Sequence, residues 1–351
     1  MVMTHRDNDR TPAVTLRGIG DTLAAIPHLL GFHPSDSIVL LTGTEHGKPL
    51  GRTLRGDLPP DHLVDAVAAD MIATLAEDDP SAALIIVIGG AADDDVAPPH
   101  EPLVFAVRRE LAAHGVTDVA AYWVPELAAD ARYRCYDDPG RTGRMSDPGS
   151  SVLAAVMASK GYVTYASRSE LVALLAPDSE PRVARRAELI EARRAAGTGT
   201  WPLPCRVAVV RDGLCAARRD GVALTDTQIA TLAIALSDVE VRDACLATAL
   251  PPDSERAGAA AALWQALTRA LPAPERAIPA SLAAYAAYMR GDGALASIAL
   301  STALDADPDH LLAGLLDQAL RHGIPPSRLH QLAGHDTIGL CAGEDDLDAS
   351  A

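Results

Sequence analysis

Short apolar runs alternate with helical patterns through the first half of the chain. The runs at 38–41 and 84–88 are apolar on both faces, which is typical of strands covered by helices on two sides. Apolar residues recur at helical spacing over 61–75 and 103–114, and a polar break at 44–48 predicts a β-hairpin. We therefore expect an α/β N-terminal domain, in which a mixed sheet is covered by helices. Further strands are expected at 13–16, 50–58, 119–124 and 133–136.

The strand pattern stops at Asp178, and the remaining apolar spacing is helical with short Pro or Gly punctuation. The pattern predicts four parts: an α/β sandwich domain at 11–178, a helical linker at 179–204, an all-α, repeat-like C-terminal domain at 205–335, and an acidic disordered tail at 336–351.

One segment of the second half has the spacing of a helical repeat. Small residues at Ala296 and Ala303, with Leu300 and Leu304 between them, resemble the second helix of a tetratricopeptide repeat, which Asp307-Pro308 would end. The preceding helix fits poorly, since Ala284 and Ala287 stand where that repeat has glycine and tyrosine. One good unit with degenerate neighbours indicates paired helices.

Composition limits how these cores are built and which partners suit them. Apolar residues make up 48% of the chain and aromatics only 3%, so the cores must consist of Ala, Leu, Val and Ile. Arginine carries nearly all the positive charge, beside only Lys48 and Lys160, which suggests a high-GC bacterial source. A net charge of −17 disfavours general nucleic-acid binding and anionic membranes.

An arginine-rich run is the one local exception to this acidic character. Its members are interleaved with Glu188 and Glu191, so we expect a solvated helix face rather than a phosphate-binding patch. The run comprises Arg182, Arg185, Arg186, Arg193 and Arg194.

The cysteines and the hydropathy indicate a cytoplasmic protein. The five cysteines are far apart and form no C-x-x-C pair, which fits a reducing compartment. The first ten residues lack a signal-peptide core, and the longest strongly apolar run, 82–88, is too short to span a bilayer.

No cofactor motif is complete. Gly18-Ile19-Gly20 lies between a strand and a helix, but the third glycine of a dinucleotide turn is replaced by Leu23. Walker, H-E-x-x-H and G-x-S-x-G motifs are absent. We therefore expect no cofactor.

The strongest candidate ligand-binding cluster consists of His33, Asp36, Ser37, Arg55 and Asp57. If the strands at 38–41 and 50–58 form a hairpin, the residues before the first and after the second lie at one end of the sheet. Carboxylates beside a guanidinium can hold a polar ligand or an ion, or form a structural salt bridge, and we favour the structural role.

Cys135 is the candidate reactive thiol, because Arg132 and Arg134 beside it could activate it. A buried strand cysteine is the favoured alternative. With His28 and His33 it could also bind zinc, but two histidines on either side of a helix end need not face each other, so we predict no metal site.

A series of short motifs runs along most of the chain in a fixed order. They are Leu16-Arg17-Gly18; Leu29-Leu30-Gly31-Phe32 with Pro34, Asp36 and Ser37; Arg55 with Asp57-Leu58-Pro59; Gly161 with Ser167-Arg168-Ser169-Glu170-Leu171; Val241-Arg242-Asp243; and Gly291-Asp292-Gly293-Ala294 with Asp307-Pro308. In these motifs and their order the chain resembles an actinobacterial family known only as a domain of unknown function, number four-one-nine-two in that series. It departs from the family around 133–143, where members often carry several cysteines and this chain keeps Cys135 alone. The resemblance implies no activity.

Two functional hypotheses follow. The first is a cytoplasmic, non-catalytic protein whose helical C-terminal domain binds a protein partner or a second copy, with a small-molecule ligand left open for the α/β domain. The second is an enzyme, such as a hydrolase, with its site at the sheet end near Asp36, Ser37, Arg55 and Asp57.

Overall fold

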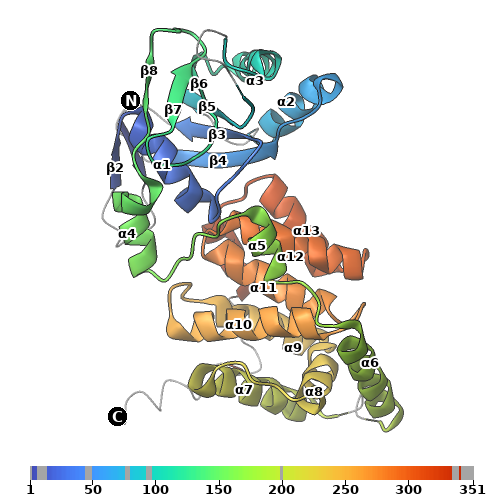
Figure 1. Cartoon of the computed structure of the whole chain (residues 1–351). Coiled ribbons are helices and arrows are strands. Elements are labelled where there is room, and N and C mark those ends of the chain that lie inside the picture. The colour runs from blue at the N-terminus through green and yellow to red at the C-terminus, as the bar shows by residue number, and fades with distance from the viewer. Residues whose placement is uncertain are drawn as a thin grey trace. The chain divides into compact units, whose positions relative to one another are not determined.

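The computed structural model describes residues 2–5, 14–43, 50–75, 80–91, 97–197, 201–333 and 340. It divides into two compact units, Met1–Arg168 and Ser169–Ala351 (Figure 1). The sequence places the end of the α/β domain at 178, and the compact units divide between Arg168 and Ser169. The predicted tail, 336–351, lies outside the described residues except for Leu340.

The first unit is built on a mixed six-stranded sheet with the order β4-β3-β5-β6-β7-β8. The expected hairpin of β3 and β4 is present, and β5 pairs with β3 antiparallel and with β6 parallel. A separate antiparallel pair is formed by β1 and β2. The strands are β1 Val2–His5, β2 Val14–Arg17, β3 Ser37–Gly43, β4 Leu50–Asp57, β5 Ala82–Ile88, β6 Asp118–Val124, β7 Arg132–Cys135 and β8 Thr142–Arg144.

Helices cover both faces of this sheet, as the apolar runs predict. Val39 and Leu41 face a core shared with α1 (Ile19–Leu30) and α4 (Val152–Ser159). Ile38 and Leu40 face the opposite core, shared with α2 (Val64–Ala73) and α3 (Glu101–Ala113). Both cores are mainly aliphatic, in keeping with the low aromatic content. The expected α/β domain is confirmed.

The second unit is entirely helical in its described part, which confirms the expected all-α region. Its centre is α11, because every residue from Pro279 to Met289 is buried. Helices α10, α12 and α13 pack against α11. The helices are α5 Arg168–Ala173, α6 Glu180–Ala195, α7 Leu203–Asp220, α8 Asp226–Leu236, α9 Val239–Ala244, α10 Glu255–Ala270, α11 Ala277–Met289, α12 Gly293–Ala306, α13 Leu311–Arg321 and α14 Pro326–Leu329. Among the described helices, none is long and apolar enough to cross a membrane.

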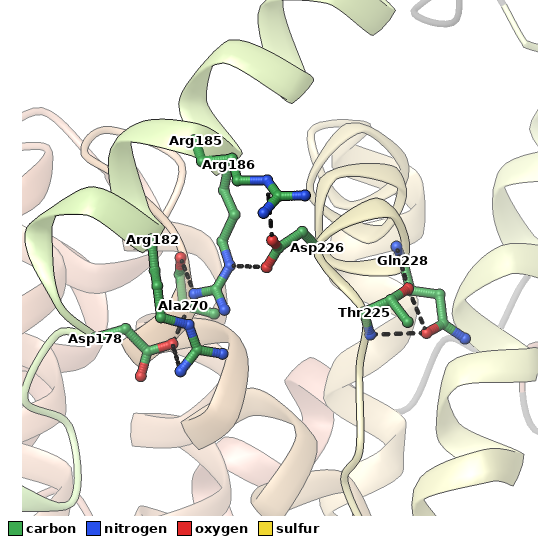
Figure 2. A network of polar contacts seen from close by, with 8 residues as sticks. All are labelled: Asp178, Arg182, Arg185, Arg186, Thr225, Asp226, Gln228 and Ala270. Atoms are coloured by element: carbon green, nitrogen blue, oxygen red, sulfur yellow. Dashed lines mark hydrogen bonds and ion pairs between the residues drawn. The ribbon is translucent and has the colours of Figure 1, made fainter.

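One arginine of the predicted solvated face is instead buried, which corrects that expectation. The Arg186 side chain is only 1% exposed and contacts Asp178 at 2.7 Å and Asp226 at 2.8 Å. Its guanidinium also donates to the Ala270 carbonyl at 3.0 Å (Figure 2). Burial alone would lower the pKa of Arg186, but the hydrogen bonds to Asp178 and Asp226 outweigh it and raise the pKa. Arg186 therefore links α6 to the start of α8 and the end of α10.

The position of Asp226, one of the two carboxylates that contact Arg186, is fixed by the N-terminal cap of α8. The Thr225 hydroxyl accepts a hydrogen bond from the backbone amide of Gln228. The side-chain oxygen of Gln228 accepts one from the backbone amide of Thr225 (Figure 2). This capping box makes Asp226 the first residue of the helix, beside Arg186. The hydrogen bond from Arg186 lowers the pKa of Asp226.

We expect Arg186→Ala to destabilise the protein by about 3 kcal/mol or more, because it leaves two carboxylates without their shared cation. Arg185 is the matched control, since it lies 3.5 Å from the same Asp226 but its side chain is 72% exposed. Arg185→Ala should cost less than about 1 kcal/mol. Urea unfolding of the full chain measures both, and equal losses would contradict this role for Arg186.

Candidate functional site

The sheet end beside β3 is where the sequence placed a candidate site. Since β3 runs antiparallel to β4 and β5, its first residue, Ser37, pairs with Asp57 and with Ile88. The last residues of β4 and β5 therefore lie beside the first residue of β3. Backbone contacts close the same edge, because the Leu58 amide donates to the Asp36 carbonyl at 2.9 Å.

Arg55 joins three of the predicted residues into one cluster. Its Nε donates to the Ser37 hydroxyl at 3.0 Å, and its Nη2 lies 2.5 Å from Asp57 Oδ1. Its guanidinium carbon lies 5.9 Å from the centroid of the Phe32 ring. Arg55, on β4, thus links the side chains of Ser37 at the start of β3 and Asp57 at the end of β4.

Ser37 is fully engaged and buried. Its hydroxyl donates to the Ser35 carbonyl at 2.6 Å while its oxygen accepts from Arg55. Nucleophilic catalysis needs a hydroxyl directed at a general base and open to a substrate. The geometry of Ser37 instead favours the structural role.

Asp36 does not join that cluster. Its backbone is left-handed, with φ 42°, and a Cβ at Gly89 would lie 2.6 Å from Asp36 Oδ1. The Asp36 carboxylate therefore lies against the backbone of Gly89, where only glycine fits. Gly89 in turn accepts a hydrogen bond from Trp123 Nε1 at 2.7 Å.

His33 is held by the backbone at another part of this edge. Its amide donates to the Tyr165 carbonyl at 2.9 Å, and its ring hydrogen-bonds to the backbone of Leu127. Burial, and then the neighbouring His28, lower the pKa of His33. Both ring nitrogens of His28 are also engaged, with Thr164 Oγ1 and the Pro148 carbonyl, each at 2.8 Å. No group of His, Cys, Asp and Glu side chains that could hold a metal occurs in the described part of the chain.

Cys135, the candidate reactive thiol, is buried in β7 within the core shared with α1. It pairs with Tyr122 across the strands, and its Sγ donates weakly to Asp137 Oδ2 at 4.0 Å. Reactive cysteines sit in partly exposed, electropositive surroundings. The burial and the carboxylate neighbour favour the structural alternative.

The helical unit presents a different kind of candidate site on α13. Leu312 and Leu316 pack inward, whereas Leu311 is 71% exposed and Leu315 is 56% exposed. The two exposed leucines are four positions apart, so they lie on one face of the helix. We call Leu311 and Leu315 the outer leucine face. The sequence contained a signal for this face in the pairs Leu311-Leu312 and Leu315-Leu316. Adjacent residues of a helix point in different directions, so one leucine of each pair can face the core while the other faces away from it.

His310 starts the helix that carries this face. Its Nδ1 accepts from the Ala313 amide at 3.2 Å, as an N-cap residue does. Burial, and then the charge of Arg242, lower the pKa of His310. The cap requires Nδ1 to be unprotonated, so the neutral ring carries its proton on Nε2.

We expect Arg55→Met to destabilise the first unit by about 1–3 kcal/mol, because the buried Ser37 hydroxyl loses a charged donor. Asp57→Asn is the control, since Asp57 is exposed and its ion pair is screened by water. The control should change stability by less than about 1 kcal/mol. Thermal unfolding of both variants tests this, and an unchanged Arg55→Met would argue against the structural role.

We expect the free energy of unfolding to fall as the pH drops below about 6.5, the ordinary pKa of histidine. The unfolded state then takes up a proton that the folded His310 resists, because its folded pKa is lowered. His310→Asn should keep the cap and flatten this dependence, although His33 contributes a dependence of the same sign. His310→Ala should also flatten it but lose about 1 kcal/mol at pH 8. Chemical unfolding between pH 8 and pH 5 measures these differences, and an unflattened slope in both variants would refute them.

Comparison with known proteins gives one match. The model of a family described as a domain of unknown function (DUF4192) matches residues 20–327. No curated protein and no solved structure matches the chain. The matched segment spans both compact units, including the Arg55 cluster and the outer leucine face. The chain therefore belongs to this family of unknown function, DUF4192.

Proposed function

We propose that this is a cytoplasmic, non-catalytic protein that binds another protein through the outer leucine face of its helical unit. The observation that carries the proposal is the pair of exposed leucines, Leu311 and Leu315, on one side of α13. Large apolar side chains exposed together on a folded surface are typical of interaction sites. The engaged state of Ser37 at the sheet end supports a non-catalytic role.

The scaffold behind this face supports its use as a binding surface. Helix α13 packs on α12 and α11, and the segment after it is fixed to α11 by two tyrosines. Tyr288 Oη donates to the Ile324 carbonyl at 2.8 Å, and Tyr285 Oη donates to the Leu329 carbonyl at 3.0 Å. A preorganised helix loses little conformational entropy on binding. The resemblance of 291–308 to a tetratricopeptide repeat agrees with this use of paired helices.

The charges near the face indicate the chemistry of the partner. Exposed Asp305 and Asp309 lie at the end of α12 and in the turn before α13, close in sequence to Leu311. A partner segment with apolar side chains and flanking arginines or lysines would complement both features. We therefore expect a basic, amphipathic protein segment.

The test is capture of a partner by the full chain from a lysate of a high-GC bacterium, the source that the composition suggests, followed by binding of the purified partner. The double variant Leu311→Ser/Leu315→Ser should weaken binding at least about tenfold, because each leucine loses on the order of 1.5 kcal/mol of apolar burial. Binding should also weaken as salt increases.

Val239→Ser is the matched control, because Val239 is an exposed apolar residue on α9, outside the outer leucine face. It should bind like the wild type, and circular dichroism should show that both variants are folded. Equal binding by the wild type and the double variant would refute the proposal.

A further inference from the structure

Helix α4 of the first unit has an apolar surface that its own unit leaves uncovered. The helix reads Val-Leu-Ala-Ala-Val-Met-Ala-Ser, yet only Leu153 is buried, with Val156 and Met157 partly buried against the core. Val152 is 69% exposed at its start, and Val163, in the segment that follows, is 61% exposed. Ala155 and Ala158 are exposed between them. A helix that is apolar all round normally has neighbours on every side.

The same segment carries no acidic residue. The chain has 47 aspartates and glutamates and a net charge of −17, but none lies between Asp147 and Glu170. Two copies of such an acidic protein repel each other over most of their surfaces. The stretch around α4 is therefore a place where two copies can approach without that repulsion.

The charges at the ends of the helix make this surface self-complementary. Asp147 precedes the N-terminus of α4 and is exposed, and its carboxylate accepts from the Gly149 backbone amide and the Ser150 hydroxyl without losing its charge. Lys160 is the C-cap residue of the same helix. If two copies of α4 pack antiparallel about a two-fold axis, Lys160 of each copy lies near Asp147 of the other. The small side chains of Ala155 and Ala158 allow the two helices to come close.

We infer that the exposed face of α4, formed by Val152, Ala155, Ala158 and Val163, binds a second copy of this chain in an antiparallel two-fold arrangement. This contact is separate from the outer leucine face, since it involves another unit and other residues. A helix of eight residues makes a small interface, so the dimer is weak, with a dissociation constant on the order of 10–100 µM.

Sedimentation velocity of the full chain, from about 1 µM to about 500 µM, tests this inference. The wild type should shift from the 36.6 kDa monomer towards twice that mass as the concentration rises. Val152→Asp and Ala155→Arg should remain monomeric with unchanged thermal unfolding. Val239→Asp, an equivalent change on α9 of the other unit, should dimerise like the wild type.

A cysteine at the middle of the helix tests the geometry. In an antiparallel two-fold arrangement Ala155 of one chain lies near Ala155 of the other. Ala155→Cys should therefore give a disulfide-linked dimer under mild oxidation. The wild type, with its exposed Cys205, is the background for this measurement. A chain that stays monomeric at every concentration overturns the inference, even if α4 then binds lipid vesicles or a different protein. Dimerisation that survives both Val152→Asp and Ala155→Arg overturns it as well.

Discussion

The helical unit depends on the complete burial of α11. This helix is largely apolar on all sides, and its residues from Pro279 to Met289 are all buried. An isolated helix of this kind would be insoluble, so neighbours must cover it on every side. Helices α10, α12 and α13 are among the neighbours that pack against it. The covering helices then have outward faces of their own, and on α13 that face carries Leu311 and Leu315.

Polar contacts fix the relative positions of helices and strands, which packing of aliphatic side chains alone leaves variable. Alanine, leucine and valine pack well but direct no specific register, whereas a buried guanidinium accepts only a few geometries. Arg186 selects the arrangement of α6, α8 and the end of α10 in one unit. Arg55 connects the start of β3 to the end of β4 at the sheet end of the other. Arg55, Ser37 and Asp57, which the sequence offered as candidate ligand-binding residues, thus contact one another at this sheet end.

The surfaces left uncovered carry the functional proposals. Both the outer leucine face and the exposed face of α4 are apolar surfaces in a chain with a net charge of −17. The first lies close in sequence to exposed aspartates, which favours a basic partner, whereas the second lies in a stretch without acidic residues, which favours a second copy. Their surroundings, rather than the apolar residues themselves, distinguish the two partners.

The amino-acid sequence determined most of the elements, the fold class and the hairpin that brings Ser37, Arg55 and Asp57 together, because these follow from apolar periodicity and local turns. The short strands β1 and β8 were not predicted. The sequence did not show that Arg186 is buried while the arginines beside it are exposed. The burial of a helix position depends on which other helices pack against it. The sequence also could not direct Asp36 towards Gly89 and away from Arg55, because a left-handed backbone at one residue turns its side chain away. The exposure of Leu311, Leu315 and Val152 was decided only by tertiary packing, which covers one face of a helix and leaves the other to solvent or to a partner.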